Sequence, residues 1–159
     1  MANNYSQFSE GFDVTEEEAK WINDFLCAEC PHPDEEPEKY KSWCEERTLK
    51  EGDDPDYFPG FQYDLENKDS TFLWLYAAEG CDTDYLATFV QAFLKKFRPK
   101  DVLTFTGASY CSKLRLGEFG GWWLAVSANE IAAGNTWDDA RDVAKLMVKK
   151  LGATKKGKK

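Results

Sequence analysis

The sequence contains two apolar stripes with helical spacing, and the second repeats the first 54 positions later. Spacings of three and four residues are typical of amphipathic helices that bury one face. The stripes are Leu86, Phe89, Val90, Phe93, Leu94 and Phe97, and then Ala140, Val143, Ala144, Met147, Val148 and Leu151. Each stripe follows two short apolar segments, at 61–65 and 71–78 and again at 102–108 and 121–128. The pattern therefore predicts two ββα units in tandem.

Capping residues indicate where these two helices begin and end. Asp82 or Thr83 caps the first helix, and Pro99 ends it. Thr136 opens the second helix, and Gly152 is expected to end it.

The region before these units predicts two further helices. Thr15 and Glu18 have the spacing of a capping box, and an apolar stripe continues from there to Pro31. A shorter helix is predicted to begin at Pro37, because proline is favoured in the first turn.

Two ββα units predict an α+β domain with a four-stranded, mainly antiparallel sheet. The helices of both units are expected on one face. Leu73 and Trp74 must point to opposite faces, so the two N-terminal helices are expected to cover the second, aromatic face. We expect one domain at 1–152, with an acidic helical region at 1–59 and the ββα core at 60–152. Residues 153–159 are expected to form a flexible lysine-rich tail.

The charges are unevenly distributed along the chain. The net charge is −9 from 29 acidic and 20 basic residues, and residues 1–69 alone hold 20 acidic and six basic residues. Dense carboxylates can imitate the charge of a nucleic acid and occupy a basic groove on another protein. Such an acidic face would not itself bind DNA. The partner-binding residues that this reading predicts are Asp34, Glu35, Glu36, Glu38, Asp53, Asp54 and Asp56.

Four residues have a spacing that zinc ligands can have, namely Cys27, Cys30, His32 and Cys44. The second C-x2-C or H-x3-H pair of common zinc sites is missing, so packing of the thiols is the preferred interpretation. His32 is the only histidine, which leaves little scope for Ser-His or Cys-His catalysis. No cofactor is expected.

The long connection of residues 109–121, from Ser109 to Gly121, is a second candidate site. Hairpins need only two to five linking residues, and longer loops often carry function. Lys113 and Arg115 are candidates for binding an anion, and Cys111 is a weak candidate nucleophile. The alternative is that these cations form ion pairs with the acidic half while the glycines serve a turn.

Five cysteines without an export signal favour a reducing cytoplasm, and the longest apolar runs are too short to span a membrane.

Several segments resemble a family of small acidic proteins that occurs in bacteriophages and mobile elements and has no assigned function. The resemblance covers roughly 61–137 and rests on Leu73-Trp74-Leu75-Tyr76, Phe89-Val90-Gln91-Ala92-Phe93-Leu94, Phe97-Arg98-Pro99, Cys111-Ser112-Lys113, Arg115 and Gly117-Glu118-Phe119-Gly120-Gly121. It implies an accessory protein in a bacterial cytoplasm and supplies no catalytic or binding residues.

The leading hypothesis is a non-enzymatic acidic binding protein, an inhibitor or nucleic-acid mimic that acts on a host or defence protein. The alternatives are an enzyme or anion-binding protein that uses residues 109–121, and a zinc-stabilised interaction module. The sequence leaves the oligomeric state open.

Overall fold

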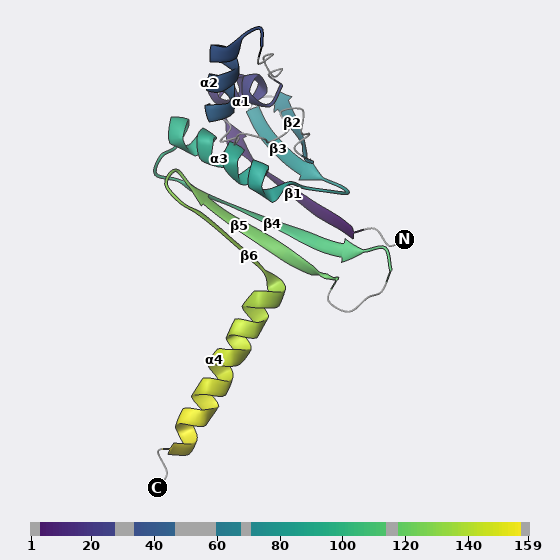
Figure 1. Cartoon of the computed structure of the whole chain (residues 1–159), viewed down its shortest axis with the longest axis vertical. Helices are drawn as coiled ribbons and strands as arrows, with labels where there is room; N and C mark the ends of the chain where they lie inside the picture. The colour runs from purple at the N-terminus through teal and green to yellow at the C-terminus, as the bar shows by residue number, and fades with distance from the viewer. Residues whose placement is uncertain (1–3, 28–33, 47–59, 68–70, 114–117, 157–159) are drawn as a thin grey trace.

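The computed structural model describes residues 4–27, 34–46, 60–67, 71–113 and 118–156, and it confirms the α+β class. The elements in chain order are β1 (Asn4–Val14), α1 (Glu16–Cys27), α2 (Pro37–Glu46), β2 (Gln62–Asn67), β3 (Thr71–Ala77), α3 (Thr83–Phe97), β4 (Val102–Cys111), β5 (Gly120–Ser127), β6 (Ile131–Asn135) and α4 (Thr136–Lys156). Figure 1 shows their arrangement.

In the part of the chain that the structure describes, the sheet has six strands, and the prediction of four was wrong. Their order is β2-β3-β1-β4-β5-β6, and every neighbouring pair is antiparallel. The unpredicted strand β1 lies between the two ββ units, where Phe8 pairs with Ala77 of β3 and with Gly107 of β4. Thus the N-terminal segment joins the two predicted units into one sheet.

The second unpredicted strand, β6, forms the far edge of the sheet. Ser127 and Glu130 close the β5–β6 hairpin, since the Ser127 amide donates to the Glu130 carbonyl oxygen at 2.8 Å. The strand is only five residues long and contains two alanines and a glycine. These residues have low β-propensity, so pairing with β5 rather than local preference defines the strand.

The core lies between the sheet and helices α1 and α3. Phe89 and Phe93 on α3 are buried, and Trp21 and Phe25 on α1 pack against them with ring centroids 5.6–6.2 Å apart. Phe12 on β1 lies 5.6 Å from Phe93, on the sheet face that α3 covers. Helix α1 therefore lies beside α3 and not on the opposite face, which corrects the expected position of this N-terminal helix (Figure 1).

The opposite face of the sheet carries aromatic side chains. Trp74 and Tyr76 stack with ring centroids 4.2 Å apart, and 38% of Trp74 is exposed. Tyr5 and Tyr110 stack across β1 and β4 at 5.0 Å. Trp74 and Tyr76 point away from Leu73 and Leu75 as predicted, but among the described helices none packs over Trp74.

Helix α4 projects away from the rest of the molecule, whereas the prediction placed it on the sheet beside α3 (Figure 1). All of its residues whose exposure is described, 136–149, are exposed. Two hydrogen bonds attach the first turn of α4 to β5. Thr136 Oγ1 accepts from the Gly121 amide at 2.9 Å, and Asp139 Oδ2 accepts from Trp123 Nε1 at 2.7 Å. The helix also continues beyond Gly152 to Lys156, so residues 153–156 are helical rather than part of a tail.

Candidate functional site

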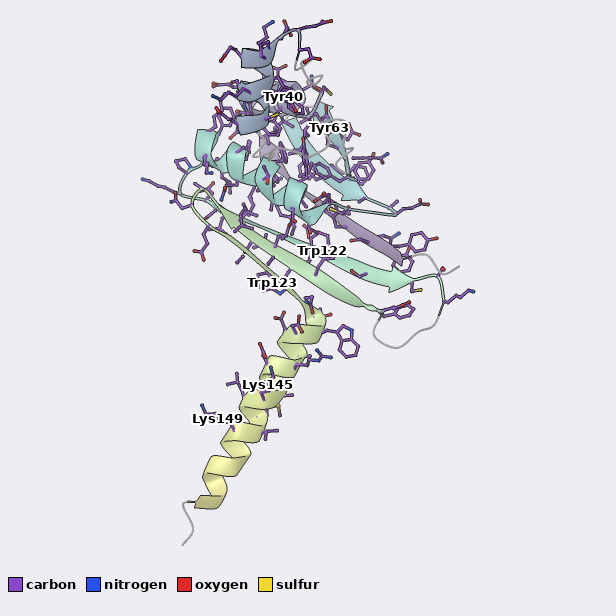
Figure 2. All side chains as sticks on the ribbon, viewed as in Figure 1. Tyr40, Tyr63, Trp122, Trp123, Lys145 and Lys149 are labelled. Atoms are coloured by element: carbon purple, nitrogen blue, oxygen red, sulfur yellow. The ribbon has the colours of Figure 1, made fainter. Side chains whose placement is uncertain are left out.

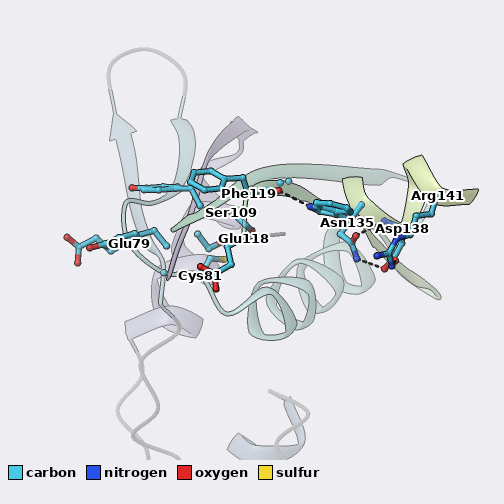
Figure 3. A pocket seen from close by; sticks show the side chains of 15 residues that line it. Glu79, Cys81, Ser109, Glu118, Phe119, Asn135, Asp138 and Arg141 are labelled. Atoms are coloured by element: carbon cyan, nitrogen blue, oxygen red, sulfur yellow. Dashed lines mark hydrogen bonds and ion pairs between the residues drawn. The ribbon is translucent and has the colours of Figure 1, made fainter. Parts of the chain in front are cut away.

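The largest of the described pockets lies at the end of the sheet where β1 and β5 begin and β4 ends (Figure 3). Its volume is about 880 Å³, which is within the range of small-molecule sites. The described residues that line it are Tyr5, Ser6, Glu79, Gly80, Cys81, Ser109, Tyr110, Glu118, Phe119, Gly120, Gly121, Asn135, Trp137, Asp138 and Arg141.

Aromatic rings form much of the pocket wall. Tyr5 and Tyr110 are direct cross-strand partners, which explains their stacking. Trp137 is held in place because its Nε1 donates to the Phe119 carbonyl oxygen at 2.9 Å. The Arg141 guanidinium lies 5.6 Å from the Trp137 ring centroid, a cation–π distance.

The charged groups of the pocket are mainly acidic. Glu79, Glu118 and Asp138 contribute carboxylates, and Arg141 is the single cation among the described lining residues. Arg141 also lies 3.8 Å from Asp138, so part of its charge is balanced within α4. The described wall is therefore negative, which favours a cationic group over an anion.

The thiol in the pocket wall is poorly suited to nucleophilic catalysis. Burial, with a smaller effect from the Asp82 carboxylate, raises the pKa of Cys81 to about 12. The thiolate is the nucleophilic form of cysteine, and this thiol stays protonated at neutral pH.

The predicted loop contributes its two ends to the pocket, but not its candidate functional side chains. Ser109 and Gly121 line the pocket, whereas Cys111 is only 4% exposed at the end of β4, and Lys113 is exposed. Neither Cys111 nor Lys113 is among the described lining residues. Arg115 lies outside the described residues.

The structure describes two of the four candidate zinc ligands, Cys27 and Cys44. Cys27 is exposed and contacts the Tyr63 hydroxyl, and Cys44 is a free, half-buried thiol. Cys30 and His32 lie outside the described residues. Within the described ranges, no group of three or more His, Cys, Asp or Glu residues is arranged to hold a metal ion.

The predicted acidic contact residues are also described in part. Asp34, Glu35, Glu36 and Glu38 are all exposed immediately before α2 and in its first turn. Glu36 pairs with Lys39 within the same turn. The remaining three, Asp53, Asp54 and Asp56, lie outside the described residues.

Most of the residues that line the pocket were not predicted from the sequence. Tyr5, Glu79 and Trp137 come from three segments far apart in the chain, and only the sheet order brings them together. The alternation of Phe8, Phe12 and Val14 is the one sequence signal that could have placed β1, and with it Tyr5, in the sheet.

No family model matches the chain, no curated protein is significantly similar to it, and no solved structure matches its fold significantly. Among the described helices, none has the length and apolar character needed to cross a membrane.

Proposed function

We propose that the chain is a non-enzymatic binding protein whose acidic N-terminal region occupies a basic groove on another protein. The observation that carries this proposal is the row of exposed carboxylates around the start of α2, at Asp34, Glu35, Glu36 and Glu38. The resemblance to phage and mobile-element proteins makes a host or defence protein in a bacterial cytoplasm the expected partner. The protein would act as an inhibitor or as a nucleic-acid mimic.

Electrostatics supports this proposal. Three of the four carboxylates have no ion pair with a described residue, while Glu36 is paired with Lys39. Exposed carboxylates retain most of their hydration and attract a cationic surface over about a Debye length, ~8 Å at physiological salt. Such attraction speeds association and gives specificity for basic partners.

The chemistry of the pocket gives little support to an enzyme. Its thiol, Cys81, is held protonated, and the described residues that line it include no histidine. A binding protein needs neither group.

The test is capture of partners from host lysate on the immobilised protein at about 50 mM and about 500 mM salt. Proteins retained at low salt and released at high salt are expected, and a variant with Asp34→Asn, Glu35→Gln, Glu36→Gln and Glu38→Gln should lose them. The control neutralises four exposed carboxylates elsewhere, with Asp64→Asn, Asp84→Asn, Asp101→Asn and Glu130→Gln. Equal capture by both variants would mean that total charge, and not this region, determines binding.

A second candidate function rests on the pocket. Its aromatic wall and three carboxylates suit a small organic cation, because cations bind aromatic faces and are attracted to carboxylates. This differs from the anion that Lys113 and Arg115 suggested. Thermal stabilisation by a benzylammonium or polyamine salt, lost in a Glu79→Gln variant, would support it, and stabilisation by phosphate instead would contradict it.

A further inference from the structure

A smaller groove lies between helices α1 and α3, away from the pocket at the end of the sheet. Its volume is about 340 Å³. The described residues that line it are Trp21 and Phe25 of α1 and Ala92, Lys95 and Lys96 of α3. The groove and the sheet-end pocket share no described lining residue, so they are two separate sites.

The apolar floor of the α1–α3 groove is held in place by the core. Phe25 is buried, and its ring packs against Phe89 of α3 with centroids 5.6 Å apart. Trp21 stacks on the same Phe89 ring at 6.2 Å and lies 5.7 Å from Phe97. Ala92 contributes a single methyl group to the lining, so a larger side chain at this position would fill the space. The floor is therefore preformed, which lowers the cost of binding a ligand there.

The rim of the groove is positively charged. Lys96 Nζ lies 5.5 Å from the Trp21 ring centroid, and Lys95 Nζ donates to Gln91 Oε1 at 2.9 Å. Within the part of the chain that the structure describes, neither lysine forms an ion pair, and the described lining of the groove contains no carboxylate. Although the whole protein has a net charge of −9, this groove favours an anion.

We propose that the α1–α3 groove binds a small amphiphilic anion, namely a carboxylate that carries an aromatic or short aliphatic group. The apolar group covers Trp21 and Phe25, where it buries nonpolar surface. The carboxylate accepts hydrogen bonds from the ammonium groups of Lys95 and Lys96. A volume of about 340 Å³ is at the lower end for small-molecule sites, which fits one ring with a short acidic chain. An inorganic anion would leave the apolar floor uncovered, and a neutral aromatic molecule would leave both cations unpaired.

Titration of the full chain with 3-phenylpropionate tests this site by nuclear magnetic resonance. The signals of the Trp21 indole N–H and the Ala92 amide should shift, with a Kd of about 1 mM or below, as expected for a ligand of this size. The neutral amide of the same acid, 3-phenylpropanamide, should bind about 5–10-fold more weakly, because it lacks the charge that pairs with the lysines. The cation 3-phenylpropylamine should not shift these signals. No shift with the carboxylate up to about 10 mM, or equal affinity for the amide, would overturn the proposal.

Two variants show whether the ligand binds in this groove. Ala92→Leu fills the groove and keeps both cations, so it should abolish the shifts. Lys95→Gln with Lys96→Gln keeps the apolar floor and should weaken binding of 3-phenylpropionate about 5–10-fold. The matched control is Lys145→Gln with Lys149→Gln on α4, where both side chains extend into solvent (Figure 2). This control should bind the carboxylate as the native protein does.

Two results with these variants would overturn the proposal. Equal weakening by the control would mean that total charge determines binding, and unchanged binding by Ala92→Leu would place the ligand elsewhere. Glutamine has nearly the helix propensity of lysine, so the Lys95 and Lys96 variant tests the site even if Ala92→Leu does not fold. Neither measurement involves the carboxylates around the start of α2, so this proposal and the proposed function can fail separately.

Discussion

The Arg98 guanidinium binds both carboxylate oxygens of Glu18, with Nε and Nη2 each donating a hydrogen bond at 2.7 Å. The same Nη2 also donates to the Asp13 carbonyl oxygen at 2.8 Å. Glu18 completes the predicted capping box with Thr15, since the Thr15 amide donates to Glu18 Oε2 at 2.7 Å. One ion pair therefore joins the end of α3 to the start of α1 and to the last residues of β1.

The Glu18→Gln substitution should destabilise the protein. Glu18 is 5% exposed, and its loss would leave the partly buried Arg98 charge without its carboxylate. Removal of one partner of a fully buried pair costs about 3–5 kcal/mol. Because one quarter of Arg98 is exposed to solvent, we expect a smaller cost here, about 2–3 kcal/mol. Urea unfolding measures this difference. The exposed Lys39–Glu36 pair is the control, where Glu36→Gln should change stability by less than about 0.5 kcal/mol.

The free energy of unfolding should depend on pH through the same Glu18–Arg98 ion pair. The hydrogen bonds from Arg98 hold the pKa of Glu18 below 4.5, despite the opposing effect of burial. A carboxyl group with a depressed folded-state pKa contributes stability above its unfolded pKa and loses it as the pH falls through the folded value. The stability gap between the native protein and Glu18→Gln should thus be full at pH 7 and shrink on acidification below 4.5. A gap that is constant with pH would contradict this account.

Gly107→Ala should destabilise the sheet through Trp122. A Cβ atom at Gly107 would overlap the Trp122 ring, which packs on Phe8 and donates to Ser6 Oγ. Displacement of a packed ring typically costs about 1–3 kcal/mol. Gly80→Ala is the control, because a Cβ atom there meets no atom within 4 Å. Thermal unfolding of the two variants compares them, and equal melting temperatures would count against the packing described.

Trp123→Phe should loosen the start of α4 with little effect on the core. The substitution removes the hydrogen bond from Trp123 Nε1 to Asp139. Faster amide hydrogen exchange in the first turns of α4 is the expected result. Trp74→Phe, which removes a similar 2.9 Å bond to Ser9 on the open sheet face, should leave α4 unchanged.

Thiol labelling at pH 8 tests the proposal that the protein is not an enzyme. Cys27 is exposed, whereas Cys81 has a raised pKa and Cys111 is buried. Iodoacetamide should therefore modify Cys27 well before the other two. Preferential labelling of Cys111 would contradict this expectation and would support the alternative that Cys111 is a catalytic nucleophile.

The elements that could be predicted from the sequence are those defined by a local apolar periodicity and by capping residues. Helix α3 begins after Asp82, whose carboxylate accepts from the Asp84 and Tyr85 amides, and its predicted apolar stripe is buried or half-buried. Strand β6 and the position of α4 were not predictable in this way. Both depend on pairing with β5 and on contacts of Thr136 and Asp139 that no periodicity encodes.

The candidate site was predicted less well. The two ends of the predicted loop, Ser109 and Gly121, line the pocket, but the acidic and aromatic character of the wall comes from Glu79, Trp137 and Tyr5. The repeat also explains the error about α4: the second stripe has the same spacing as the first, yet alanine and valine replace most of its phenylalanines and leucines. These smaller side chains bury less apolar surface, so periodicity alone overstated the gain from packing on the sheet.

The most direct test of the proposed function is a competition on a captured partner. Fluorescence anisotropy would follow a labelled DNA duplex bound to that partner while the protein is added. The proposed mimicry predicts that the protein displaces the duplex, less effectively as salt rises, and that the variant neutralised at Asp34, Glu35, Glu36 and Glu38 displaces it poorly. A ternary complex in which duplex and protein bind together, or equal displacement by the neutralised variant, would contradict it.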